Sequence, residues 1–198
     1  MNMGGSSGDA DGPQQVAVIS PQFCVNEPIE LTLVRKRKSF RVTDVNDNIM
    51  LTVKGKFFSL RERRVLYDVA GNPLITFQPK FPSLHGRWVV FRGGGESADS
   101  MDLLFSVKSK RDVFLATNTQ EELCDFKIES SWLNRSCVIY AGGDSSNIVA
   151  KMQSAQSFLF GGDTFKVTVY SNVDYAFIVA LVVILVNPEA QTVSVASS

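Results

Sequence analysis

Short segments in which apolar and polar residues alternate follow one another from Glu30 to Tyr170. Because successive side chains of a strand point to opposite faces, this period of two predicts strands with one buried face. Gly, Asn, Asp and Pro separate the segments at regular spacing, which is typical of an all-β barrel or sandwich. Twelve strands are predicted, at residues 30–35, 39–45, 48–54, 63–69, 73–78, 87–92, 102–108, 112–117, 124–129, 135–141, 147–153 and 164–170.

The segment from Tyr175 to Val186 departs from this pattern because it has no charged residue and no turn residue. A membrane-spanning helix needs ~20 apolar residues, whereas runs of ~10–14 more often form a buried helix. A strand is an alternative on propensity, since about half of these residues are β-branched. The run is long for a strand, however, and we predict a helix at residues 173–186.

Polar residues mark both ends of this predicted helix. Ser171 and Asn172 are favourable N-cap residues, and Ser171 with Asp174 approximates a capping box. The pair Asn187-Pro188 is expected to end the helix, because the residue before a proline avoids the α region.

A helix that is apolar on every side must be enclosed on every side. Burial of its large side chains would contribute ~15–30 kcal/mol, more than the ~5–15 kcal/mol by which a whole domain is stable. A closed barrel with the helix in its interior meets this requirement and leaves few sheet edges exposed. We therefore predict a mainly β fold, a closed twelve-stranded barrel around a central C-terminal helix, with a membrane anchor as the alternative.

The length of 198 residues, with 44% hydrophobic and 20% charged residues, fits one globular domain. We expect this domain at residues 23–188, between disordered tails at residues 1–22 and 189–198. The first residues are rich in Gly, Ser and Asp and lack the apolar region of a signal peptide, so secretion is not expected.

The balance of charge and the cysteine content indicate which binding partners and which cellular compartment to expect. Lys+Arg and Asp+Glu number 20 each, and this balance gives no reason to expect a nucleic-acid partner. The three cysteines, Cys24, Cys124 and Cys137, are widely spaced and form no CxxC pair. We expect free thiols in a reducing compartment, the cytoplasm.

Candidate enzymatic residues are few. His85 is the only histidine, so a Ser/His or Cys/His mechanism would have to use it, and no cysteine has a context that lowers its thiol pKa. Asp44–Asn48 begins like a calcium loop, but Ile49 replaces the required glycine and Gly55 replaces the bidentate glutamate. We predict a hairpin turn there, no metal, no cofactor and no enzymatic activity.

Three basic runs stand out along the chain. Consecutive cations cannot lie in the middle of a strand of a filled barrel, because half of them would face the core, so we expect them at turns or strand ends. They are either ordinary turn residues or a patch for anionic lipid headgroups. The candidate lipid-binding residues are Arg35, Lys36, Arg37, Lys38, Arg61, Arg63, Arg64, Lys108, Lys110 and Arg111.

Several segments, in order, resemble the plant LURP-one-related family: LRERRVLYD, GNPLITFQPK, GRWVVFRGG, DLLFSVKSK, CDFKIESSWLNRSCVIYAG and FKVTVYSNVDYAFIVALVVIL. The likeness covers residues 21–187. It implies a tubby C-terminal-like fold, a twelve-stranded barrel around a central hydrophobic helix. The wider superfamily includes phospholipid scramblases and tubby-like proteins described as membrane-tethered transcription factors, and some LURP-one-related members are linked to plant defence.

The resemblance implies a non-enzymatic, membrane-tethered signalling module whose partners are phosphoinositides or an anionic membrane surface. The phosphoinositide-binding residues of tubby proteins have no residue-by-residue match here, so lipid binding is implied by the superfamily alone. A scramblase-like lipid transporter and a protein-binding scaffold with an unknown partner are the alternatives. We expect a cytoplasmic protein, peripheral at the plasma membrane, without a transmembrane helix.

Overall fold

The computed structural model describes residues 15–55, 62–83, 86–94, 102–131, 135–143, 145–155 and 163–187. Within these ranges the chain forms a short 3-10 turn, η1 (Pro21–Phe23), then twelve strands and one α-helix, α1 (Tyr175–Leu185). The strands are β1 (Ile29–Lys36), β2 (Ser39–Thr43), β3 (Ile49–Gly55), β4 (Arg64–Tyr67), β5 (Pro73–Pro79), β6 (Trp88–Arg92), β7 (Leu103–Lys108), β8 (Asp112–Leu115), β9 (Phe126–Ser131), β10 (Ser136–Ala141), β11 (Ile148–Ala155) and β12 (Thr164–Val169).

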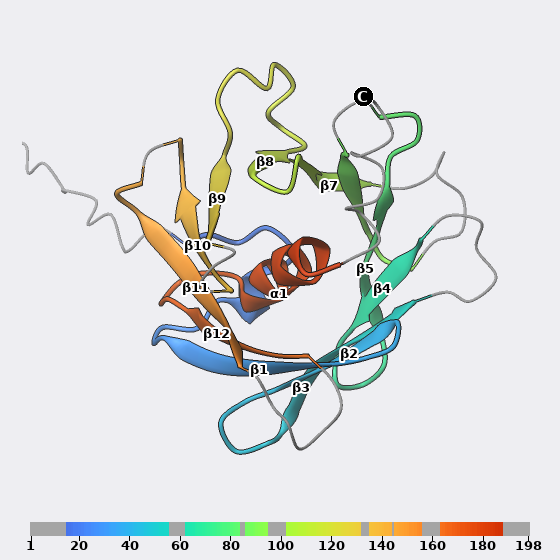
Figure 1. Ribbon diagram of the computed structural model, residues 1–198, viewed down its shortest axis with the longest axis vertical. Coiled ribbons are helices and arrows are strands. Elements are labelled where there is room, and N and C mark those ends of the chain that lie inside the picture. Colours follow the sequence, from blue (N-terminus) through green and yellow to red (C-terminus); the bar gives the residue numbers. More distant parts are fainter. Residues whose placement is uncertain are drawn as a thin grey trace, which may run out of the picture.

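These strands form one closed antiparallel barrel (Figure 1). Each strand pairs with the next along the chain, and β12 pairs with β1 to close the sheet. The twelve predicted segments are confirmed as strands, with small differences at their ends. In β1, for example, Leu31 and Leu33 are buried while Glu30 is exposed, which is the alternation expected of a wall between core and solvent.

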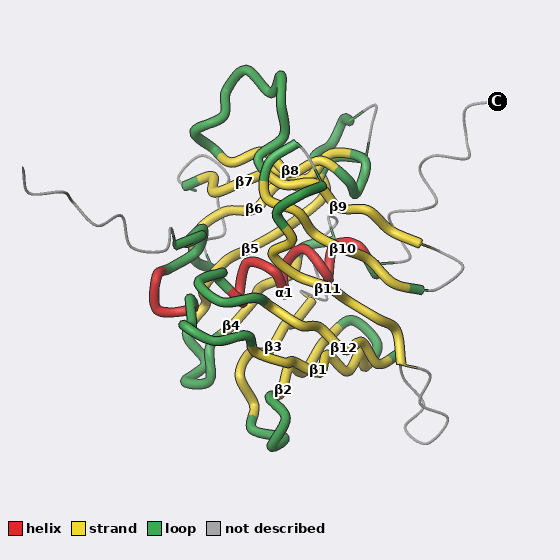
Figure 2. Tube along the Cα trace, turned by 90° about the vertical axis from the view of Figure 1, so that its left-hand side faces the viewer, coloured by secondary structure: helices red, strands yellow, loops and turns green. Residues whose placement is uncertain are grey.

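Helix α1 lies inside the barrel, with strands around it in both views (Figures 1 and 2). Its side chains from Tyr175 to Ile184 are all buried. Phe177 packs against Phe105 of β7 and Phe126 of β9, with ring centroids 5.0 and 4.9 Å apart. The prediction of a central helix enclosed on every side is confirmed.

The helix begins later than the capping pattern suggested. The N-cap is Asp174, whose Oδ1 accepts a hydrogen bond from the backbone N–H of Phe177 at 3.0 Å. Ser171 and Asn172 do not serve as N-caps, because Asn172 has a left-handed backbone (φ 62°) and Val173 forms an extended bridge with Val16. The chain is therefore still non-helical at residue 173.

The packed chain also starts upstream of the expected domain boundary at residue 23. Val16 pairs with Val173, and the buried side chain of Ile19 belongs to the hydrophobic core. Phe23 packs edge-on against Tyr175 at a centroid distance of 5.4 Å. Residues 16–24 thus form part of the barrel domain. Residues 1–14 of the expected N-terminal tail (residues 1–22) and the whole expected C-terminal tail (residues 189–198) lie outside the described residues.

The connections alternate between the two ends of the barrel, because consecutive strands are antiparallel. We call the end at which α1 begins the N-mouth and the end at which α1 ends the C-mouth. The turns at residues 44–48 and 68–72 lie at the N-mouth. The turns at residues 37–38 and 109–111 lie at the C-mouth, together with the last residues of β3 and β5 and the first residues of β4 and β6.

Candidate functional site

The last turn of α1 is capped by two basic side chains from the barrel. Lys110 Nζ donates hydrogen bonds to the carbonyl oxygens of Leu185 at 3.1 Å and Asn187 at 2.9 Å. Arg64 Nη2 donates to Asn187 Oδ1 at 3.1 Å. The last carbonyls of a helix have no partner within the helix and carry partial negative charge, so cations are stabilising there.

The same hydrogen bonds bring the three basic runs together. Arg64, from the second run, also donates through Nη1 to the carbonyl oxygen of Lys38, in the first run, at 2.9 Å. Asn187 then links Arg64 to Lys110 in the third run. All three runs therefore meet at the C-mouth, around the end of α1.

The first run forms the exposed part of this cluster. Lys36 ends β1, and Arg37 and Lys38 make the turn to β2, with Arg37 in a left-handed conformation (φ 54°). All three are exposed, while Arg35 pairs with Asp163 at 3.3 Å. The expectation that these four cations occupy a strand end and a turn is confirmed.

The other two runs divide into buried and accessible cations. Arg63 and Arg64 are only 8% and 5% exposed, and Lys110 is half-buried. Burial lowers the pKa of Arg64, assisted by the charge of Arg35, and burial also lowers the pKa of Lys110. Arg111 is exposed and Lys108 half-buried, whereas Arg61 lies outside the described residues.

We use the name C-mouth cations for the accessible members, Lys36, Arg37, Lys38, Lys108 and Arg111. Phe81 lies in the β5–β6 connection at the same end of the barrel and is 58% exposed. The C-mouth thus presents accessible cations and an exposed aromatic ring, two kinds of residue from which peripheral membrane sites are built.

The thiols are poor nucleophiles in this structure. Burial raises the pKa of Cys24 to about 11 and that of Cys137 to about 12, and it also raises the pKa of Cys124. The thiolate is the reactive form, so these environments suppress its population. His85, the other candidate for catalysis, lies outside the described residues.

The calcium-like segment forms the expected hairpin turn. Asp44 Oδ1 accepts hydrogen bonds from the backbone N–H groups of Asn46 and Asn48, and Oδ2 accepts one from the Asn48 side chain. Both carboxylate oxygens are thus used within the turn. Across the described ranges, no group of three or more His, Cys, Asp or Glu residues is arranged to hold a metal ion.

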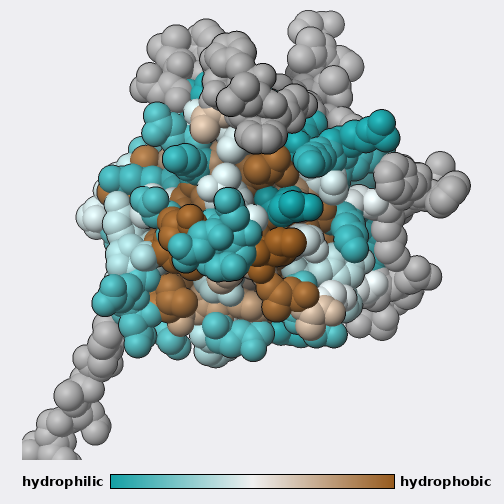
Figure 3. Space-filling view, turned by 90° about the horizontal axis from the view of Figure 1, so that it is seen from below, coloured by the Kyte–Doolittle hydropathy of each residue, from teal (hydrophilic) through white to brown (hydrophobic). Residues whose placement is uncertain are grey.

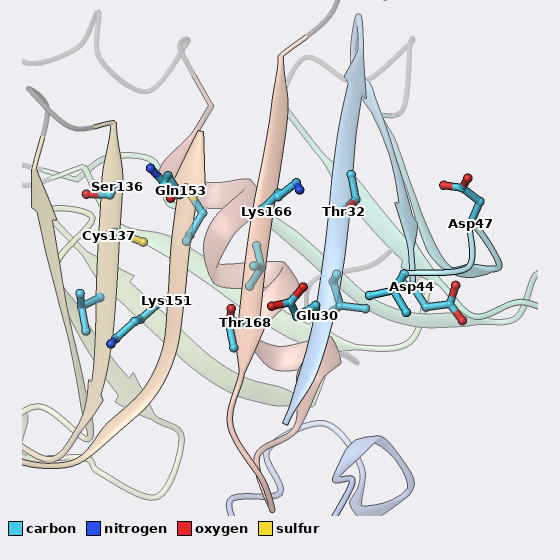
Figure 4. A pocket seen from close by; sticks show the side chains of 15 residues that line it. Glu30, Thr32, Asp44, Asp47, Ser136, Cys137, Lys151, Gln153, Lys166 and Thr168 are labelled. Atoms are coloured by element: carbon cyan, nitrogen blue, oxygen red, sulfur yellow. The ribbon is translucent and has the colours of Figure 1, made fainter. Parts of the chain in front are cut away.

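A groove on the outer wall of the barrel was not foreseen from the sequence (Figure 4). It has a volume of about 880 Å³ and crosses β10, β11, β12 and β1, with the β2–β3 turn as one side. Ser136, Gln153, Lys166 and Thr32 line it from four different strands. Only the strand register brings these residues together, which is why sequence reasoning missed the groove.

The fold and the C-mouth define a class: closed twelve-stranded barrels of the tubby-like type, with an apolar C-terminal helix inside. The chain belongs to the LURP-one-related family, whose model matches residues 29–186. It is 47% identical to the Arabidopsis thaliana protein LURP-one-related 15, over 90% of both chains. It is 41% identical to the Arabidopsis protein LURP1, over 89% of this chain and 91% of that one.

A solved structure supports the same assignment. The X-ray structure of the Arabidopsis thaliana protein AT5G01750 matches with a TM-score of 0.70 and 47% sequence identity. The match covers 85% of this chain and 96% of the Arabidopsis chain. Separately, none of the helices in the described ranges has the length and apolar character needed to cross a lipid bilayer.

Proposed function

We propose that this protein is a non-enzymatic module that binds anionic membrane surfaces reversibly through its C-mouth. The observation that carries the proposal is the convergence of the three basic runs around the end of α1. A signalling role, in plant defence, is what the family resemblance adds to this proposal.

The distribution of charge supports binding in one orientation. The chain has equal numbers of basic and acidic residues, so it has no net charge to attract a membrane at random. The C-mouth carries the five accessible cations beside Asp112 and Asp163, whereas the N-mouth turns carry Asp44, Asp47 and Asp68. An anionic bilayer would therefore attract the C-mouth and repel the N-mouth.

The expected free energy of membrane binding corresponds to a weak, reversible contact. Each cation near an anionic leaflet contributes ~1 kcal/mol, so the five C-mouth cations supply ~5 kcal/mol. Insertion of the Phe81 ring would add ~2 kcal/mol. A total of ~7 kcal/mol corresponds to a Kd on the order of 10 µM.

The test is co-sedimentation of the protein with neutral, phosphatidylserine and phosphoinositide vesicles over a range of salt concentrations. We expect salt-sensitive binding to the anionic vesicles, strongest with a phosphoinositide. A Lys36→Ala/Arg37→Ala/Lys38→Ala variant removes three cations and should bind about 100-fold more weakly.

The matched control is an Arg41→Ala/Lys54→Ala/Lys127→Ala variant. It removes three cations from strand positions on the barrel wall and changes the net charge by the same amount. Equal loss in the two variants would show that binding depends on net charge and not on the C-mouth. No binding of the unmodified protein at low salt would refute the proposal and leave a protein-binding scaffold as the function.

A scramblase-like transporter is the other candidate, and the burial of α1 counts against it. Insertion of α1 into a bilayer would require removing a fully buried helix from the core. Proteolysis in the presence of liposomes tests this alternative: protection of the C-terminal region by the bilayer would favour it.

A further inference from the structure

The outer groove brings polar side chains into two rows. The register pairs Ser136 with Gln153, Gln153 with Lys166, and Lys166 with Thr32, so these four residues form one row across β10, β11, β12 and β1. The hydrophobic neighbours Leu31, Met152 and Val167 face inward and are buried. The row therefore presents two hydroxyls, an amide and an ammonium group to the groove.

The second row brings in another lysine beside the first. Lys151 lies opposite Thr168, which lies opposite Glu30. Lys151 and Lys166 are thus diagonal neighbours on adjacent strands, with backbone positions ~7–8 Å apart, while their ammonium groups point away from each other in Figure 4. No ion pair joins either lysine to a carboxylate within the described part of the chain, and Lys151 lies over the Tyr170 ring at 6.0 Å.

We propose that this groove binds an anionic polyol, a hydroxyl-rich molecule that carries a phosphate or carboxylate group. The ammonium group of Lys166, which points toward Thr32 in Figure 4, fits the anion, while the hydroxyl and amide groups of Thr32 and Gln153 fit the hydroxyls around it. Lys151 adds a second positive charge on the β11 side of the groove. Glu30 lies beside Thr168 and Asp47 lies in the β2–β3 turn at the far side of the groove (Figure 4), where their carboxylates would accept hydrogen bonds from further hydroxyls of the ligand. Its volume of about 880 Å³ lies within the ~300–1,000 Å³ of ordinary ligand sites.

Other classes of ligand fit this surface less well. The groove has no aromatic ring among its described lining residues, so it offers no platform on which a nucleobase could stack. An extended peptide could not add a strand, because every strand of the closed barrel is already paired on both sides. The groove is also separate from the C-mouth cations, since it begins near Glu30 and Thr32 while Lys36 ends the same strand.

The first experiment is a titration of ¹⁵N-labelled protein with glucose 6-phosphate, with glucose and inorganic phosphate as parallel probes. We expect glucose 6-phosphate to shift the backbone signals of residues 151–153 and 166–168 and to bind at least tenfold more tightly than either parallel probe. Equal affinity for inorganic phosphate would refute recognition of the polyol. Signals that move only at residues 36–38 would place the anion at the C-mouth and refute the groove.

Variants test the individual contacts. Lys151→Gln and Lys166→Gln should each weaken binding of glucose 6-phosphate about tenfold, because each removes one charged hydrogen-bond donor. Lys54→Gln is the matched control, since Lys54 also lies over a tyrosine ring, that of Tyr67 at 5.2 Å, but on β3 outside the groove. If all three substitutions weakened the binding of glucose 6-phosphate equally, the groove would not be the binding site.

A last arm distinguishes a soluble ligand from a lipid headgroup. Phosphatidylinositol vesicles are tested with the Lys36→Ala/Arg37→Ala/Lys38→Ala variant, in which binding through the C-mouth is expected to be about 100-fold weaker. Binding of these vesicles that Lys166→Gln abolishes would make a headgroup the source of the anionic polyol, whereas binding of glucose 6-phosphate alone would make the source soluble. Failure of both probes would refute the groove proposal and leave the proposed function of the C-mouth untouched.

Discussion

Replacement of Asp174 by alanine should destabilise the barrel more than replacement of any exposed carboxylate. Asp174 is completely buried at the N-mouth. Its Oδ1 caps α1, and its Oδ2 accepts hydrogen bonds from the backbone N–H groups of Val18 at 3.2 Å, Ile19 at 2.6 Å and Ser20 at 3.1 Å. One side chain therefore fixes both the start of the helix and the N-terminal segment that lies across it.

The magnitude follows from these contacts. Loss of an N-cap costs ~0.5–2 kcal/mol. A buried donor left without a partner costs ~1–3 kcal/mol, and the N–H of Ile19 is the buried one of the three. The N–H groups of Val18 and Ser20 are partly buried, so water can replace some of what they lose. We expect a total loss of ~3–5 kcal/mol, a large part of the ~5–15 kcal/mol that stabilises a typical domain.

The assay is equilibrium unfolding in urea, followed by the fluorescence of the buried Trp88. Hydrogen exchange of the amides at residues 18–20 should accelerate in the variant even where the rest of the barrel stays protected. Asp68→Ala is the control, because Asp68 also accepts a hydrogen bond from a backbone N–H, that of Asn72 at 2.8 Å, but in an exposed turn. A stability loss in Asp174→Ala no larger than in Asp68→Ala would refute the reasoning.

Two further predictions concern the opposite end of the helix and the core. Lys110→Met should lower the free energy of unfolding by ~1–3 kcal/mol, because the carbonyls of Leu185 and Asn187 lose their donor; an unchanged urea midpoint would contradict this role. The pKa of Cys137 rises from 9.0 to about 12 on folding, so its contribution to stability is complete below pH 9 and is lost as the pH rises toward 12. Between pH 9 and pH 12 the unfolding free energy of the unmodified protein should fall by ~1.4 kcal/mol per pH unit more than that of Cys137→Val. If the two proteins lose stability equally over this range, the Cys137 thiol is not the group responsible.

The sequence was sufficient for the elements that depend on local pattern. Alternation located the strands because each one separates core from solvent, and the length of the apolar segment distinguished α1 from a membrane span. The packing of residues 16–22 was not predicted, because this short apolar segment follows a Gly- and Ser-rich stretch and nothing in it indicates the distant carboxylate that holds it, Asp174.

The candidate site shows the same division between local and long-range information. Arg64 and Lys110 were predicted to be turn residues or part of a lipid-binding patch, and nothing near them in the sequence reveals that β4 and the β7–β8 turn meet the end of α1. The lysines of the groove, Lys151 and Lys166, become neighbours only through the register of β11 with β12. Register depends on pairings between distant segments, which a single sequence does not state.

The division between buried and accessible cations also determines what membrane binding can do to this protein. The accessible C-mouth cations and Phe81 would supply ~7 kcal/mol at an anionic surface. Removing α1 from the barrel would leave the inward-facing side chains that pack on it, such as Phe105 and Phe126, without their partner, and would also break the caps that Asp174 and Lys110 provide at its two ends. Because a bilayer would rebury the helix but not the emptied core of the barrel, and because 11 residues are too few for the ~20 of a spanning helix, membrane contact that keeps the barrel intact is favoured over extraction of α1. Reversible attachment of a closed barrel is therefore the mode of membrane contact that these energies favour.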